Sequence, residues 1–139
     1  MTLYVLDTDI LSLYQSGHST VCQCVSVVPP DEVAVTVISV EEQLSGWYTL
    51  LRRAKRRDQI AGVYERLTRT VASLAQARIL TYSVSAIDQF EALRTLKLRV
   101  RATDLRIAAI ALDAGAIVVT RNARDFSQIP GLTVEDWSV

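Results

Sequence analysis

The chain has 139 residues, of which 50% are hydrophobic and 22% charged, so it can form a substantial core, and we expect residues 1–139 to be a single domain. Its 15 Lys and Arg residues balance its 15 Asp and Glu residues, which excludes a strongly basic nucleic-acid-binding protein and leaves only local basic patches for such a partner. No apolar run approaches the roughly 18 residues of a membrane span, and Met1 leads directly into a predicted strand instead of a signal peptide, so we expect a cytoplasmic protein without membrane contact.

The first predicted element is a buried strand that ends in two acids. Residues 3–6 are apolar, and Asp7 follows at the carboxyl end of this run. Asp9 is placed to cap the helix predicted over residues 10–14, which Gly17 ends. We therefore predict that Asp7 is free for chemistry and that Asp9 is a helix cap.

A second short helix, predicted to end at Pro29 and Pro30, carries the two cysteines of the chain. Cys22 and Cys24 are two positions apart, which on a helix points them to different sides, so we expect reduced, structural thiols. His18, the single histidine, is expected at the surface. A zinc site or a histidine-based nuclease is therefore not expected.

Residues 33–38 are predicted to form a second buried strand, followed by a long helix. Ser39 and Glu42 have the spacing of a capping box, so Glu42 can be structural or functional, and Glu41 is the neighbouring alternative. Gly46 favours function for Glu42. It lies one turn later on the same side, and a glycine inside a helix costs roughly 1 kcal/mol unless a close approach requires it.

This helix runs to a basic segment at residues 52–57, and a further helix is predicted over residues 58–77, so we expect the two to form a protruding hairpin. The basic segment is interpreted as a solvated helix end, with phosphate contact as the alternative. Trp47 and Tyr48 can stack on a base, but their position beside apolar residues favours packing.

The C-terminal half continues the alternation of strands and helices. Short strands are predicted at residues 79–80, 117–119 and 132–134, and a helix over residues 84–96. Thr103 is expected to cap a buried helix that Gly115 ends, with Asp104 in its first turn. The alternation predicts a three-layer α/β/α fold with a central parallel sheet of four or five strands and helices on both faces.

In a parallel sheet the strand-to-helix junctions share one edge, which brings together Asp7, Glu42, Asp104 and residues 122–125. Clustered carboxylates repel one another unless a divalent cation compensates their charge, and magnesium or manganese accepts such oxygen ligands. A site of this kind can activate water and screen the charge of a phosphodiester. We therefore predict a divalent-metal site at this edge that is suited to such chemistry.

Four segments in order resemble the PIN domain, specifically the VapC-type toxins of toxin–antitoxin pairs. They are Val5-Leu6-Asp7-Thr8-Asp9, Glu42 with Gly46, Ala102-Thr103-Asp104-Leu105-Arg106-Ile107-Ala108-Ala109, and Val119-Thr120-Arg121-Asn122 with Asp125-Phe126 and Ile129-Pro130-Gly131-Leu132. The resemblance covers essentially the whole chain. It implies a PIN-like domain with endoribonuclease activity that depends on Mg²⁺ or Mn²⁺, a VapB-like antitoxin as inhibitor, and a homodimer.

The resemblance also implies roles for individual residues. Asp7, Glu42 and Asp104 match the three principal metal-site acids, and Asp125 matches a more variable fourth position. Asn122 stands where many relatives carry another acid, which leaves a second metal position open. Further candidates are Thr8 and Thr120 at the site and, for contact with the RNA backbone, Arg101, Arg106, Arg121 and Arg124.

Two other functions compete with this interpretation. Asp7-Thr8-Asp9 after an apolar strand also resembles the nucleophile and acid of haloacid-dehalogenase-like phosphatases, although the glycine and threonine expected after them and a late acidic pair are missing. The second alternative is a non-catalytic binding module with the same fold. Metal-dependent cleavage of RNA would separate the nuclease from both.

Overall fold

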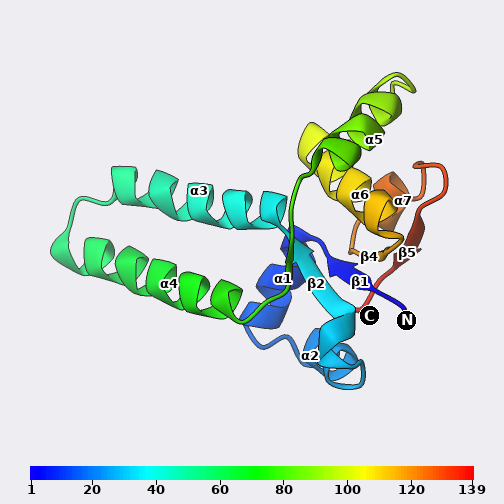
Figure 1. Cartoon of the computed structure of the whole chain (residues 1–139). Coiled ribbons are helices and arrows are strands. Elements are labelled where there is room, and N and C mark those ends of the chain that lie inside the picture. Colours follow the sequence, from blue (N-terminus) through cyan, green and yellow to red (C-terminus); the bar gives the residue numbers. More distant parts are fainter.

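Five parallel strands form the centre of the protein (Figure 1). The computed structural model describes residues 1–139, and its strands are β1 (Tyr4–Leu6), β2 (Val33–Thr36), β3 (Ile79–Leu80), β4 (Ile117–Val119) and β5 (Thr133–Glu135). Their order across the sheet is β3-β2-β1-β4-β5, and each neighbouring pair is parallel. The predicted central parallel sheet is confirmed, with β1 in the middle.

Helices connect the strands and account for most of the chain. They are α1 (Thr8–Gln15), α2 (Ser19–Ser26), the 3-10 turn η1 (Pro30–Glu32), α3 (Val37–Arg53), α4 (Arg57–Ala75), α5 (Val84–Arg94), α6 (Ala102–Ala114) and α7 (Ala123–Phe126). Each predicted helix is present, with ends that differ by a few residues. None of them has the length and apolarity required to cross a membrane.

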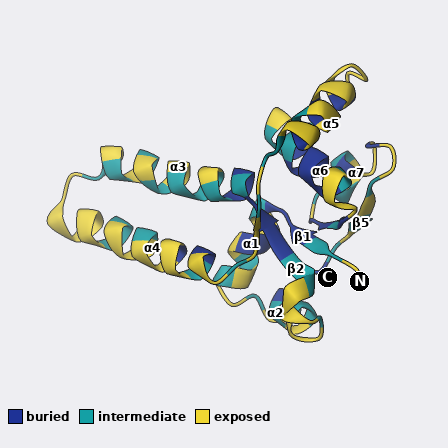
Figure 2. Cartoon of the chain, viewed as in Figure 1, coloured by how far each residue is buried: buried dark blue, intermediate teal, exposed yellow.

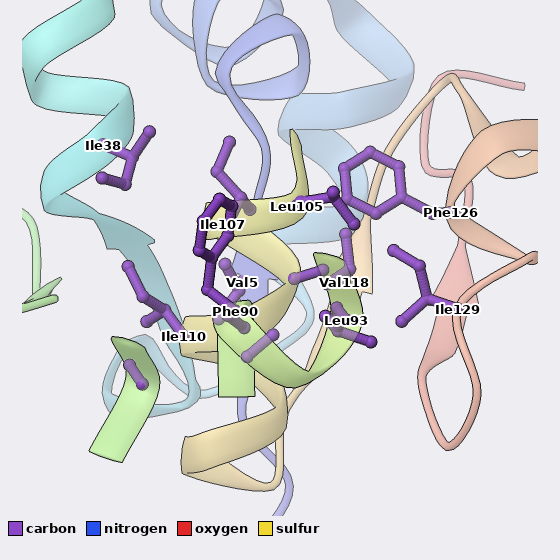
Figure 3. Close-up of a cluster of buried hydrophobic side chains, with 14 of the residues drawn as sticks. Val5, Ile38, Phe90, Leu93, Leu105, Ile107, Ile110, Val118, Phe126 and Ile129 are labelled. Atoms are coloured by element: carbon purple, nitrogen blue, oxygen red, sulfur yellow. The ribbon is translucent and has the colours of Figure 1, made fainter. Parts of the chain in front are cut away.

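The sheet separates two hydrophobic clusters, because successive strand residues point to opposite faces. Val5 and Val118 belong to the larger cluster, which is closed mainly by α5, α6 and α7 (Figure 3). Leu6 and Val119 belong to the smaller cluster, which α1 and α2 cover. The molecule therefore has the three layers that the sequence predicts. Helix α6 is the most deeply buried helix, as expected from its apolar sequence (Figure 2).

Helices α3 and α4 form an antiparallel hairpin whose far end projects from the rest of the protein (Figure 1). The indole Nε1 of Trp47 donates a hydrogen bond of 2.8 Å to Oγ1 of Thr70 and so connects the two helices. The guanidinium of Arg66 lies 6.0 Å from the centre of the Trp47 ring. Trp47 is thus half-buried between the two helices and belongs to neither hydrophobic cluster, whereas Tyr48 is exposed.

Three predicted helix caps are wrong. Two of them belong to α3, which carries Glu42, and to α6, which carries Asp104. Helix α3 begins at Val37, and its cap is Thr36, whose Oγ1 accepts a hydrogen bond from the Ser39 amide. Ser39 is therefore inside the helix and forms no capping box with Glu42. Helix α6 begins at Ala102 after Arg101, so Thr103 is not its cap.

The first helix is also capped by a different residue. Oδ1 of Asp7 accepts a hydrogen bond of 2.9 Å from the Ile10 amide, so Asp7, and not Asp9, is the N-cap of α1. His18 has an unexpected role of the same kind, because its Nδ1 accepts a hydrogen bond from Val21 at the start of α2. The predicted helix stop at Gly115 is confirmed by its left-handed backbone, with φ 65°.

Candidate acidic site

Asp7 lies at the point where the central strand β1 becomes helix α1. Its amide donates a hydrogen bond of 3.0 Å to the Val119 carbonyl, which extends the pairing of β1 with β4 by one residue. Its carboxylate turns to the start of α1, and the residue is only 5% exposed. Asp7 therefore combines a structural role as a cap with a position at the carboxyl edge of the sheet, where α/β proteins bind their ligands.

The environment of Asp7 disfavours its charged form. Burial is the largest cause and raises the pKa of this carboxyl to about 6, from 3.8. Hydrogen bonds from the Thr120 hydroxyl and the Ile10 amide act in the opposite direction, and the nearby charges of Asp9 and Asp104 raise the pKa further. The electrostatic effect of Asp104 shows that the first and third predicted acids lie near each other. A positive charge placed between them would favour their ionised forms.

Asp104 lies in the first turn of α6, as predicted, and its side chain is 8% exposed. Both of its carboxylate oxygens accept hydrogen bonds of 3.3 Å from the guanidinium of Arg101. The positive end of the helix dipole also stabilises a carboxylate at this position. A nearly buried carboxylate is thus held at the edge of the site by one exposed arginine.

Glu42 reaches the site from the second turn of α3. Its Oε1 accepts a hydrogen bond from the hydroxyl of Thr8, whose Oγ1 also lies 2.8 Å from Oγ of Ser39. Glu41 is exposed and forms no such contact. Gly46 does not mark a close approach to Glu42, however, because a Cβ at this position would meet nothing within 4 Å. The contact with Thr8 is therefore the observation that favours Glu42 over Glu41 as the site residue.

Asp125 is connected through Asn122 to Thr120, a neighbour of Asp7. Thr120 is fully buried and lowers the pKa of Asp7, and its Oγ1 accepts a hydrogen bond of 2.8 Å from the Asn122 amide. The side-chain amide of Asn122 then donates to Oδ2 of Asp125 at 2.9 Å. Asn122 precedes α7 and Asp125 lies within it, so Asp125 does not cap that turn. Asn122 in this chain binds a carboxylate instead of supplying another one.

The donor atoms at this edge suit a hard divalent cation, since they are carboxylate and hydroxyl oxygens without a sulfur or imidazole among them. The side chains are not assembled around one point, because no group of three or more His, Cys, Asp or Glu residues lies close enough to hold a metal ion. Asp104 is bound to Arg101, and Glu42 is bound to Thr8. A cation held by Asp7 and Asp104 therefore requires rearrangement of these side-chain contacts.

The candidate RNA-contact arginines differ in their contacts. Arg101 alone contacts a site acid, and its guanidinium lies near Glu42 and Asp9 as well. The guanidinium of Arg106 lies 5.1 Å from the centre of the Phe90 ring and is engaged with α5. Arg121 and Arg124 are exposed, without ion pairs. Of the four arginines, only Arg101 is therefore paired with an acid of the site.

A groove of about 680 Å³ adjoins the acidic site between α1, α3 and α4. Its lining includes Thr8 and Glu42 together with Arg66 and Arg69 of α4, two cations that the sequence analysis did not single out. Arg66 and Arg69 are three residues apart on a predicted helix, which places them on the same face, so this pair of cations could have been recognised from the sequence. The side-chain amide of Gln43 on α3 donates a hydrogen bond to Gln15 on α1 and links the two helices. No pattern in the sequence indicated this contact.

Solved structures of toxin–antitoxin proteins share this fold over nearly the whole chain. The chain is 28% identical to one in the structure of VapBC-5, a member of the VapBC family of toxin–antitoxin systems from Mycobacterium tuberculosis, with 100% of each chain covered and a TM-score of 0.62. It is 26% identical to a chain in a toxin–antitoxin complex from Klebsiella pneumoniae, with 94% and 95% covered and a TM-score of 0.70. It is 23% identical to a chain in the structure of VapBC2 from Rickettsia felis bound to a promoter DNA fragment, with 98% of this chain and 99% of that chain covered and a TM-score of 0.77.

No protein-family model matches the sequence, and no curated protein matches it either. The likeness therefore rests on the structure, where nearly the whole of each chain is covered. It gives no support to the haloacid-dehalogenase-like alternative. The chain has the fold of a VapC-type PIN-domain toxin, as the four sequence segments indicate.

Proposed function

We propose that this protein is a metal-dependent endoribonuclease and the toxin of a type II toxin–antitoxin pair, acting on RNA in the cytoplasm. The observation that carries the proposal is the pair of nearly buried carboxylates, Asp7 and Asp104, at the carboxyl edge of the sheet. Burying two neighbouring acids costs stability, and Arg101 compensates only the charge of Asp104, so the retention of both acids at one edge favours a functional reason over a structural one.

Asp7 and Asp104 are the residues that would hold Mg²⁺ or Mn²⁺, with Glu42 and Asp125 as further ligands. A bound divalent ion supplies the positive charge that activates water and screens a phosphodiester. Thr8 orients Glu42 by a hydrogen bond to its carboxylate, and Thr120 favours the ionised form of Asp7. Asn122 also holds Asp125 by a hydrogen bond. The chain thus supplies both the acids and the neutral groups that position them.

An antitoxin of the VapB kind is the proposed partner, because the structures with this fold include VapBC complexes. The groove between α1, α3 and α4 adjoins Thr8 and Glu42, so an inhibitor bound there would also obstruct the acidic site. A homodimer is part of the same proposal. A short open reading frame immediately upstream, whose product binds this protein and suppresses its toxicity, would support the pairing.

Cleavage of a labelled RNA by the purified protein tests the enzyme proposal. We expect cleavage with Mg²⁺ or Mn²⁺, none with excess EDTA, and loss of activity in Asp104→Asn. Asp88→Asn is the matched control, because Asp88 is an exposed acid on α5 and the charge change is the same. Cleavage that persists in EDTA, or full activity of Asp104→Asn, would contradict the mechanism and favour a non-catalytic binding module.

A further inference from the structure

Arg101 forms an ion pair that differs from the other two in the protein. The pairs Arg56–Asp58 and Arg69–Glu65 lie on the α3–α4 hairpin and are exposed at both ends. In the third pair, the side chain of Arg101 is 71% exposed and that of Asp104 only 8%. Arg101 is therefore largely exposed to solvent, whereas Asp104 is nearly buried within the site.

The geometry of this pair leaves Asp104 no free carboxylate oxygen. Nε of Arg101 donates to Oδ2 and Nη2 donates to Oδ1, each at 3.3 Å. Such two-point contact is specific to the planar guanidinium and is not available to lysine. Any cation that binds Asp104 has to share at least one of these oxygens with Arg101 or displace the guanidinium from it.

The charge of Arg101 also acts beyond Asp104. Its hydrogen bond and its attraction to Asp104 raise the pKa of the guanidinium, and Glu42 and Asp9 contribute in the same direction. Arg101 therefore faces three of the acids that surround the strand ends. Arg99, two residues earlier, is equally exposed but has no ion pair and no side-chain hydrogen bond.

We propose that Arg101 is a built-in counter-ion of the acidic site, which neutralises Asp104 in the metal-free protein and competes with a divalent cation for the same carboxylate oxygens. The inference rests on the proposed metal-dependent function. Release of Asp104 leaves the guanidinium free at the exposed rim, where it can contact a phosphate of the RNA backbone. One residue thereby couples the occupancy of the acidic site to the contact with substrate.

Calorimetric titration with Mn²⁺ tests the competition without any measurement of activity. The variants are Arg101→Gln and the control Arg99→Gln, which removes the same charge from the same loop. Arg101→Lys is the third variant, since it retains the charge without the two-point contact. We expect the Mn²⁺ dissociation constant of Arg101→Gln to fall about three- to tenfold, as expected for removal of a positive charge a few ångströms from a divalent ion. Arg99→Gln should match the wild type, and Arg101→Lys should lie in between.

The melting temperature gives a second readout. In EDTA, Arg101→Gln should melt below Arg99→Gln, because the nearly buried Asp104 loses its partner, and saturating Mn²⁺ should raise its melting temperature more. Wild-type affinity in Arg101→Gln would overturn the inference and leave the proposed function standing. Absence of Mn²⁺ binding in the wild type and in every variant would overturn the proposed function, and this inference with it.

Discussion

The Thr8 hydroxyl donates a hydrogen bond to Oε1 of Glu42 and thereby joins the first strand–helix junction to the second. Thr8 directly follows Asp7, so the contact places Glu42 beside the most buried acid of the site. Oγ of Ser39 lies 2.8 Å from the same hydroxyl. A neutral side chain, fixed from two directions, therefore determines where the carboxylate of α3 points.

Replacement of Thr8 by valine should reduce RNA cleavage about tenfold, within the range seen when a residue that orients a metal ligand is removed. Valine preserves the branched shape of threonine but cannot donate to Glu42. Thr8→Ser retains the hydroxyl and should keep most of the activity. The measurement is the cleavage rate at saturating Mn²⁺, with circular dichroism to verify the fold. A wild-type rate in Thr8→Val would show that Glu42 needs no such orientation.

Glu42→Gln should reduce cleavage about 10- to 100-fold, whereas Glu41→Gln should have little effect. The two residues are adjacent on α3, but Glu42 contacts the site and Glu41 faces solvent. Glutamine can still accept the hydrogen bond from Thr8, so the comparison isolates the charge. The ratio of the two rates at one Mn²⁺ concentration decides the question. A larger loss in Glu41→Gln would assign the ligand to the neighbouring position.

The strands and their acidic ends could be predicted from the sequence, because buried parallel strands are continuous apolar runs with abrupt polar ends. Val5 and Leu6 before Asp7 are an example, and so are Val118 and Val119 before Thr120. Parallel connections then require the strand ends to share one edge, and this edge is where Asp7 and Asp104 interact. These two rules place Asp7 and the residues after Val119, whereas Asp104 follows helix α5 instead of a strand and is not placed by them.

The local contacts of the site could not be predicted, because several neighbouring residues compete to cap each helix. Asp7 and Asp9 are both good caps, and the backbone decides between them: Asp7 still pairs with Val119, so α1 begins immediately after it. In α3 the β-branched residues 37 and 38 resemble strand, yet they form the first helical turn. Helices α1 and α3 therefore start earlier than propensity indicates, and Asp7 acquires two roles.

Asn122→Asp tests whether Asp125 belongs to the metal site. The substitution replaces a hydrogen-bond donor with a second carboxylate against Oδ2 of Asp125. We expect the metal-free variant to lose about 1 kcal/mol of stability, the usual contribution of such a hydrogen bond, or more because of the repulsion. Urea denaturation in EDTA measures this loss.

Mn²⁺ should restore most of that stability if the two carboxylates share a cation. Asp88→Asn is again a suitable control, because it changes an exposed charge outside the site. A variant that stays destabilised at saturating Mn²⁺ would remove Asp125 from the set of ligands and leave it as a structural partner of Asn122.

The stability of the metal-free protein should fall as the pH rises through the range set by Asp7. The pKa of this carboxyl is about 6 in the folded protein and 3.8 as an ordinary aspartate. Between these values the folded state binds a proton that the unfolded state has released, so the free energy of unfolding decreases with increasing pH. The contribution of Asp7 to the free energy of unfolding is fully present at pH values below its pKa in the unfolded state. It is lost as the pH rises above its pKa in the folded state, and the total loss is about 3 kcal/mol.

Asp7→Asn provides the reference that isolates this effect. Asparagine caps a helix about as well as aspartate, so the hydrogen bond to the Ile10 amide can persist while the titration is removed. The stability of the wild type relative to Asp7→Asn should therefore decrease by about 1 kcal/mol between pH 5 and pH 7 in EDTA, when measured by urea denaturation. Excess Mn²⁺ should reduce this decrease, because a bound cation favours the ionised carboxylate. Parallel pH profiles of the two proteins in EDTA would show that burial does not hold a proton on Asp7.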